Sequence, residues 1–246
     1  MRHAAKRFLL AAILLQTQPL SASATPEEAG AAESLAAFLR AARSVISSHQ
    51  DRINDPRLAE KNLSGGRVAA EAAELFAKQE GEAPGEIEDD LPRRLIDAQM
   101  AAVREVVDEH QPLIDERDVA FKGFIPAVFA RLVNERFAEK AGDLARVKVT
   151  APLDLVRNRK ARPDEWERAV IESRFLREDW PRGEPFSEEV EVGGRPAFRM
   201  LFPEYYTPSC LSCHGEPKGE MDVTGYPKEG GRDGDLGGVI SVTLFR

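Results

Sequence analysis

The chain has 246 residues, of which 42% are hydrophobic and 31% are charged, and its formal net charge at pH 7 is -8. This apolar content is sufficient for a folded core and excludes a wholly disordered chain. The excess of acidic residues argues against nucleic acid as a partner. The chain contains only 2 cysteines, so a disulfide framework is excluded.

The first 24 residues have the pattern of a cleaved export signal. Basic residues precede the apolar run from Phe8 to Leu15, and Ala22-Ser23-Ala24 offers a cleavage site. The run is far shorter than the roughly 20 residues that cross a bilayer. We therefore predict a signal peptide over 1–24, a mature protein located in the periplasm, and no membrane-spanning segment.

Residues 25–115 are predicted to form a helical N-terminal region. Apolar residues recur at helical spacing over about 34–53, 67–78 and 92–114. The segment 80–90 is acidic, contains Gly and Pro, and lacks this periodicity. It is predicted to be a linker between two of the helices.

Residues 116–246 are predicted to form a second unit of mixed structure. Helices are expected over about 125–141, where Gly142 follows as a terminator, and over 163–177. Strands are expected over 147–150, 187–192, 196–202 and 238–245, with Gly193-Gly194 as a hairpin turn. This order of elements predicts an α+β fold with an antiparallel sheet.

Both cysteines lie in the sequence Cys210-Leu211-Ser212-Cys213-His214. This spacing is the attachment pattern of c-type haem, because two thiols on one turn can each add to a haem vinyl group. The histidine that follows then lies under the iron. We predict that Cys210 and Cys213 form thioether bonds to one haem c and that His214 is an axial iron ligand.

Two other chemistries use a Cys-x-x-Cys pair. A redox-active disulfide places its first thiol at a helix N-terminus, where the thiol pKa is lowered. Here Pro208 before the pair and Gly215-Glu216-Pro217 after it indicate a loop. A structural zinc site usually has four ligands, so it would need His49 or His110 in addition to the motif.

The motif does not assign the sixth iron ligand. His49 and His110 are the other histidines after residue 24, and each is either a candidate sixth ligand or a hydrogen-bonded core residue. Met200 is a candidate sulfur ligand or a packing residue. Arg157 is a candidate partner for a haem propionate, because a guanidinium group matches a carboxylate.

Four segments resemble an exported family of c-type haem proteins with a PAS-like domain. They are 121–129, 157–167, the cysteine motif and 225–241, in that order. The resemblance implies an antiparallel PAS-like sheet, flanked by helices, that holds a single haem. Related domains lie at the periplasmic end of histidine kinases and chemoreceptors. A known member is similar but ligates the far side of the iron with a third cysteine, which this chain lacks.

These features predict a periplasmic protein with one haem that senses redox state or a small gaseous ligand. It would pass its signal to a redox partner or a membrane signalling protein. A soluble electron-transfer cytochrome is the first alternative, and a monohaem peroxidase-like enzyme is the second. No motif assigns a catalytic residue. Binding of nitric oxide or carbon monoxide favours the sensor, and a closed six-coordinate haem favours the carrier.

Overall fold

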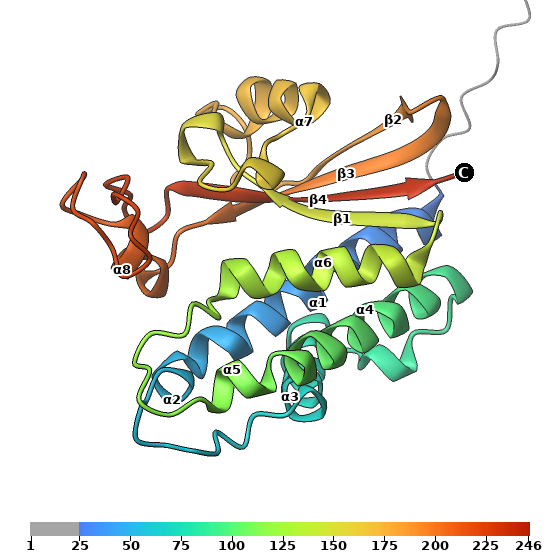
Figure 1. Ribbon diagram of the computed structural model, residues 1–246. Coiled ribbons are helices and arrows are strands. Elements are labelled where there is room, and N and C mark those ends of the chain that lie inside the picture. Colours follow the sequence, from blue (N-terminus) through green and yellow to red (C-terminus); the bar gives the residue numbers. More distant parts are fainter. Residues whose placement is uncertain (1–24) are drawn as a thin grey trace, which may run out of the picture.

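The computed structural model describes residues 25–246 and has an α+β architecture in layers (Figure 1). A four-stranded antiparallel sheet, in the order β1-β4-β3-β2, lies between several long helices on one face and shorter helices on the other. The predicted α+β class, with an antiparallel sheet and flanking helices, is confirmed. The predicted signal peptide lies outside the described residues. Within 25–246, no helix has the length and apolar character needed to cross a membrane.

Four long helices form the layer on one face of the sheet. They are α1 (Pro26–Ser48), α3 (Gly65–Glu80), α4 (Asp90–Glu109) and α6 (Pro126–Ala141). α1 and α6 pack against the sheet, whereas α3 and α4 pack against other helices (Figure 1). α1 begins with a capping box, in which the Thr25 side chain accepts from Glu28 N–H and the Glu28 carboxylate accepts from Thr25 N–H.

Two of the predicted helices are interrupted near a histidine. α1 ends at Ser48, and the short helix α2 (Gln50–Ile53) follows His49. α4 ends at Glu109, and α5 (Gln111–Asp115) follows His110. Pro112 explains the second break, because proline has no N–H to continue the hydrogen-bond ladder but is tolerated in a first turn. The predictions of one helix over 34–53 and of one over 92–114 are therefore wrong in this detail.

The sheet consists of β1 (Ala145–Thr150), β2 (Phe186–Val192), β3 (Arg195–Tyr205) and β4 (Leu236–Phe245). β2 and β3 form the predicted hairpin, and Gly193 and Gly194 at its turn have φ values of 59° and 81°. Two successive positive φ values are typical of a tight hairpin turn and favour glycine. β4, the last strand of the chain, lies inside the sheet and pairs with β1 on one edge and β3 on the other. It therefore joins β1 to the β2–β3 hairpin.

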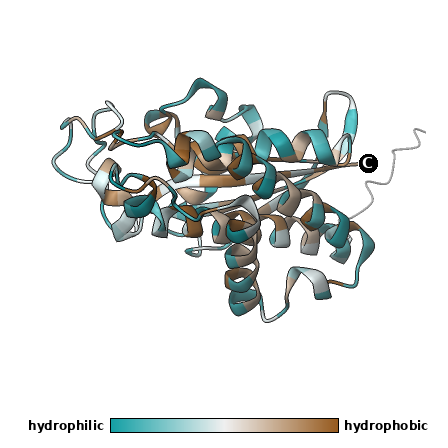
Figure 2. Ribbon diagram, turned by 60° about the horizontal axis from the view of Figure 1, so that its bottom comes forward, coloured by the Kyte–Doolittle hydropathy of each residue, from teal (hydrophilic) through white to brown (hydrophobic). Residues whose placement is uncertain are grey.

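One hydrophobic core joins the helices to the sheet. On β3, Phe198, Met200 and Phe202 face the helices and pack in the same cluster as Leu35 and Leu39 of α1. Figure 2 shows apolar residues on the sheet and on the inner sides of the helices. Met200 is therefore a packing residue. The boundary predicted near residue 116 falls in the loop before α6, and this core is continuous across it.

Short helices cover the opposite face of the sheet. α7 (Glu165–Val170) leads directly into η4 (Ile171–Phe175), a π-helical turn, where one regular helix was predicted over 163–177. Their apolar residues pack on Leu201 and Val239. Elsewhere the chain has short helical turns at η1 (Pro84–Glu86), η2 (Leu153–Leu155), η3 (Arg159–Ala161), η5 (Pro208–Cys210) and α8 (Leu211–His214).

Candidate functional site

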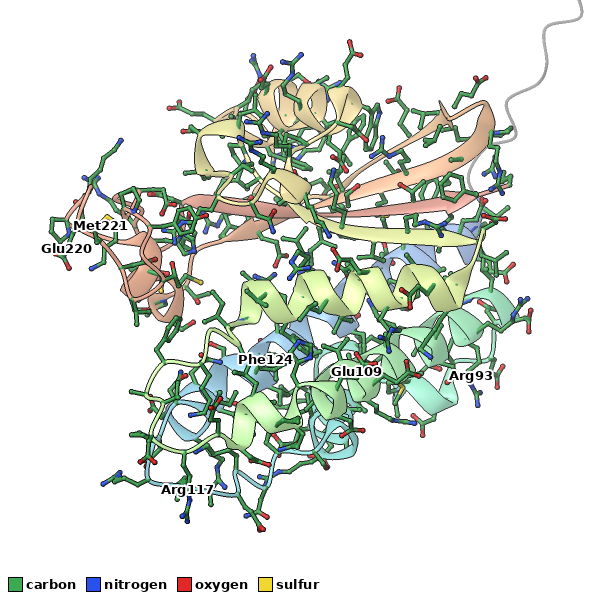
Figure 3. All side chains as sticks on the ribbon, viewed as in Figure 1. Arg93, Glu109, Arg117, Phe124, Glu220 and Met221 are labelled. Carbon is green, nitrogen blue, oxygen red and sulfur yellow. The ribbon has the colours of Figure 1, made fainter. Side chains whose placement is uncertain are left out.

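The cysteine motif lies in a long loop beyond one end of the sheet (Figure 1). β3 ends at Tyr205 and β4 begins at Leu236, so residues 206–235 connect the two strands. Within this loop, η5 and α8 are successive short turns that carry Cys210, Cys213 and His214. All three residues are partly exposed, and neither cysteine forms a disulfide. Figure 3 shows Glu220 and Met221 at the outer part of the same loop.

The His214 imidazole is held on two sides. Its Nδ1 atom lies 2.9 Å from a carboxylate oxygen of Glu229. The ring stacks on Tyr206, with centroids 5.1 Å apart and planes at 21°. Because a carboxylate only accepts hydrogen bonds, Nδ1 donates to Glu229, and in the neutral ring Nε2 then keeps its lone pair. This tautomer leaves Nε2 able to bind a metal.

Tyr206 occupies a space that two glycines leave open. Its backbone is fixed next to β3, because its N–H donates to Asp235 O and its carbonyl accepts from Gly234 N–H, each at 2.8 Å. A Cβ atom at Gly231 or Gly237 would lie 2.5 Å or 2.3 Å from the Tyr206 ring. Burial raises the pKa of Tyr206 to about 12, so its hydroxyl is neutral at physiological pH.

Arg157 connects the loop after η2 to the cysteine motif. Its guanidinium group donates to both carboxylate oxygens of Glu229, at 2.6 and 2.9 Å. It also donates to Asp222 at 2.6 Å and to the carbonyl of Cys213 at 2.8 Å. Since this one side chain contacts both halves of the 206–235 loop, it holds the turn that carries His214 in place.

The two carboxylates around Arg157 are ionised. Burial opposes the ionisation of Glu229, but hydrogen bonds from Arg157 and His214 outweigh it, and the pKa of this carboxyl lies below its usual range. The same balance holds for Asp222, whose pKa is lowered by hydrogen bonds from Thr224 and Arg157. One guanidinium and two carboxylates leave a net negative charge beside the imidazole.

The structure thus brings Arg157 to the motif but gives each of its nitrogens an oxygen partner within the protein. A contact between Arg157 and a haem propionate stays a prediction. The sequence analysis missed Glu229 and Asp222. Glu229 lies in a segment of the family resemblance, but no local pattern identifies it as a partner of His214.

His49 and His110 lie in the helical region. His49 Nε2 is 2.7 Å from Glu71 and follows the end of α1. His110 Nδ1 donates to the carbonyl of Val106 at 2.8 Å, and its ring lies 5.2 Å from that of Phe124. Across residues 25–246, no hydrogen bond, ion pair or ring contact joins either histidine to the cysteine motif. Their role as sixth ligand stays a prediction.

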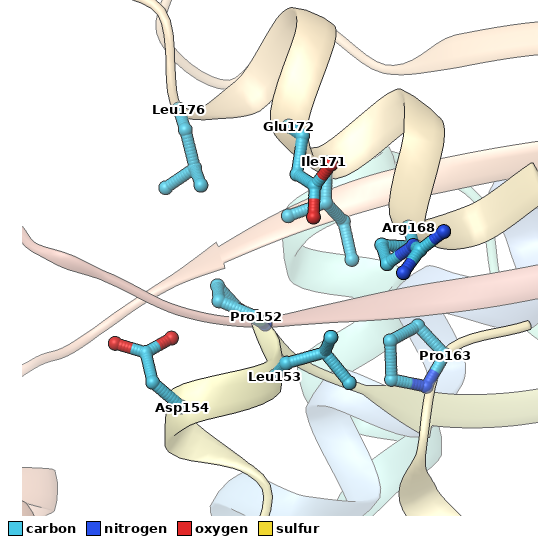
Figure 4. A pocket seen from close by; sticks show the side chains of 8 residues that line it. All are labelled: Pro152, Leu153, Asp154, Pro163, Arg168, Ile171, Glu172 and Leu176. Atoms are coloured by element: carbon cyan, nitrogen blue, oxygen red, sulfur yellow. The ribbon is translucent and has the colours of Figure 1, made fainter. Parts of the chain in front are cut away.

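The described residues also form a pocket away from the motif. A cavity of about 180 Å³ lies between η2 and the α7–η4 segment (Figure 4). Leu153, Ile171 and Leu176 contribute apolar walls, and Arg168 and Glu172 contribute charged groups. In residues 25–246, no group of three or more His, Cys, Asp and Glu side chains is arranged to hold a metal ion by itself.

Comparison with known proteins places this architecture in a family. The family model described as Tll0287-like matches residues 21–244. Neither the curated proteins nor the solved structures give a match. The family match includes the helical region as well as the motif, and it extends well before Phe121, where the resemblance found in the sequence begins. The chain belongs to the Tll0287-like family.

Proposed function

We propose that this protein binds one covalent haem c, with thioether bonds to Cys210 and Cys213 and with His214 as an iron ligand. The donor chemistry fits the group, since two partly exposed thiols and an imidazole lie on successive short turns. A bound haem would supply one-electron exchange and a coordination position for a small ligand. The proposed role is sensing of redox state or of such a ligand in the periplasm.

The observation that carries the proposal is the orientation of His214. A histidine that ligates a metal usually donates its other ring N–H to a carboxylate, a carbonyl or water. Here Glu229 accepts from Nδ1 at 2.9 Å, and Tyr206 stacks on the ring. The imidazole is therefore preorganised, with Nε2 as the donor atom, in a way that a merely structural histidine does not require.

The other residues around the motif would orient the group. Arg157 fixes the backbone at Cys213 through the carbonyl contact, so it limits the freedom of the second thioether residue. His110 has the same favourable tautomer as His214, because Nδ1 donates to a carbonyl and Nε2 keeps its lone pair. His49 instead uses Nε2 for Glu71. This difference favours His110 over His49 as the sixth ligand.

Sensing is favoured over electron transfer by the connection between the loop and the rest of the molecule. The motif loop joins β3 to β4, and both strands run through the sheet and pack on α1. A change in iron state at the loop would therefore act on elements that extend to the far end of the molecule. The alternative is a soluble electron carrier, and a monohaem peroxidase-like enzyme is the third candidate.

The test is expression of the full chain with haem-maturation machinery, followed by mass spectrometry and spectroscopy. We expect the mature chain to carry the mass of one haem, which stays attached after acid-acetone extraction. Replacing both cysteines by serine should abolish attachment. A polypeptide with no added mass would refute the proposal.

Ligand binding separates sensor from carrier. Binding of carbon monoxide to the ferrous protein and of nitric oxide is expected for the sensor, whereas a ferrous haem that binds neither supports the carrier. His110→Ala should convert the ferric spectrum to high spin, and His49→Ala should leave it unchanged. If neither substitution changes the spectrum, both histidines are excluded as the sixth ligand.

A further inference from the structure

Glu229 contacts the His214 imidazole on the side opposite Nε2. Its carboxylate is largely shielded from water, with 14% of the side chain exposed, and one of its oxygens lies 2.9 Å from Nδ1. The same oxygen accepts from Arg157 at 2.9 Å, and the second oxygen accepts from Arg157 at 2.6 Å. Arg157, Glu229 and His214 thus form a continuous chain of charge-assisted hydrogen bonds.

We propose that Glu229 is a positioning residue that sets how strongly His214 donates electrons to the haem iron, and that Arg157 limits this effect. This inference rests on the haem attachment proposed above. A carboxylate that accepts from Nδ1–H makes the imidazole a more basic ligand. A more basic ligand stabilises ferric iron relative to ferrous iron and lowers the reduction potential. Arg157 withdraws negative charge from the same carboxylate and so weakens the effect of Glu229 on the basicity of the imidazole.

A simple effect of charge near the iron predicts a similar change in potential, so a matched control is needed. Asp222 provides it, because it also pairs with Arg157, at 2.6 Å, and its side chain is fully buried. Asp222 has no hydrogen bond to His214; its other partners are Thr224 and the N–H of Tyr226. Asp222→Asn removes one negative charge from the cluster without removing the acceptor of Nδ1–H.

The experiment compares Glu229→Gln and Asp222→Asn in the haem-loaded full chain. Glu229→Gln should raise the equilibrium constant for reduction about tenfold, which is about 59 mV for a one-electron couple. It should also move the Nδ1–H proton resonance of His214 upfield in the diamagnetic ferrous protein, with carbon monoxide added if the ferrous iron is high-spin. Asp222→Asn should shift the potential less and leave this resonance in place.

Equal shifts of the potential in the two variants, with an unchanged His214 resonance in Glu229→Gln, would overturn the proposal in favour of a general charge effect. If Glu229→Gln does not fold, Arg157→Gln decides the question. Removing the guanidinium strengthens Glu229 as an acceptor, so the potential should fall and the His214 resonance should move downfield. No change, or a change in the opposite direction, would overturn the proposal. The mass of each variant shows separately whether haem is attached. A failure of the proposed haem attachment can therefore be told apart from a failure of the proposed role of Glu229.

Discussion

Two of the ion clusters centred on arginine in residues 25–246, those of Arg199 and Arg157, differ in what they hold. Arg199 of β3 lies between the sheet and α7, where it pairs with Asp164 at 2.8 Å and Glu167 at 3.1 Å. Its guanidinium group also lies 4.3 Å from the centre of the Trp166 ring. Arg157 lies in a loop and pairs only with residues of another loop.

The surroundings of the two arginines explain the difference. The Arg199 cluster sits on elements that a hydrophobic cluster already positions, with Val170 and Ile171 packed on Leu201. The 206–235 loop has no comparable apolar core among the described residues, because its buried members are few and mostly polar or glycine. An ion cluster there provides order that packing does not. It also holds a histidine with a free ring nitrogen, which the Arg199 cluster lacks.

The largest expected effect is on stability at Arg199. Arg199→Met should lower the free energy of unfolding by about 3 kcal/mol, because it leaves the buried carboxylate of Glu167 with only Lys148 as an ionic partner. In the haem-loaded protein that we propose, the reduction potential should not change, since this cluster has no contact with the motif. Urea denaturation and redox titration measure the two quantities. The control is Arg195→Gln, at a partly exposed arginine of the same strand, for which we expect less than about 1 kcal/mol.

The second effect is smaller and concerns the loop. Gly237→Ala should lower the free energy of unfolding by about 2 kcal/mol, because the new methyl group would overlap the Tyr206 ring. If the chain binds haem as proposed, displacement of Tyr206 should also change the absorption spectrum of the haem-loaded protein, which Arg199→Met should not do. The control is Gly30→Ala in α1, where no atom other than the nearby backbone of the same helix lies within 4 Å of the added carbon. An unchanged spectrum in Gly237→Ala would show that the stacking does not orient His214.

Much of the fold was predictable because it depends on periodic patterns. The strands near 147–150 and 238–245 and the hairpin at Gly193-Gly194 follow from alternation and from glycine. The breaks at His49 and His110 were not predicted, because the apolar stripe continues through them. The continuous core across residue 116 was also missed, since the sequence does not show which helix face meets the sheet.

The candidate site was predictable only where a local motif exists. Cys210, Cys213 and His214 are adjacent in sequence, so their spacing alone identifies them. Glu229 lies 15 positions after His214, and Arg157 lies 56 positions before Cys213. Their meeting depends on how two irregular loops fold, which no periodicity describes. Arg157 was proposed as a propionate partner on chemical grounds, whereas its observed partners are carboxylates and a carbonyl of the chain itself.

The two arginine clusters should also differ in how they make stability depend on pH. Burial opposes the ionisation of Asp164 and Asp222, but the pKa of each is lowered by hydrogen bonds, from Arg199 to the first and from Thr224 and Arg157 to the second. A carboxyl whose pKa is lower in the folded than in the unfolded state stabilises the protein at pH values above its unfolded-state pKa. That pKa is near 3.8 for aspartate. This contribution is lost as the pH falls through the folded value. Stability should therefore decrease below about pH 4.

Each arginine variant should remove part of this acid sensitivity. Without Arg157, the pKa of Asp222 should return toward its usual value or rise above it, because the side chain is fully buried, and stability should then depend less on pH below about 4. Arg199→Met should give a smaller flattening, because the Asp164 side chain is 48% exposed and is solvated in both states. Urea denaturation at several pH values between neutral and acid measures both slopes. Parallel curves of stability against pH for the wild type and Arg157→Gln would mean that Arg157 does not pair with Asp222 in solution.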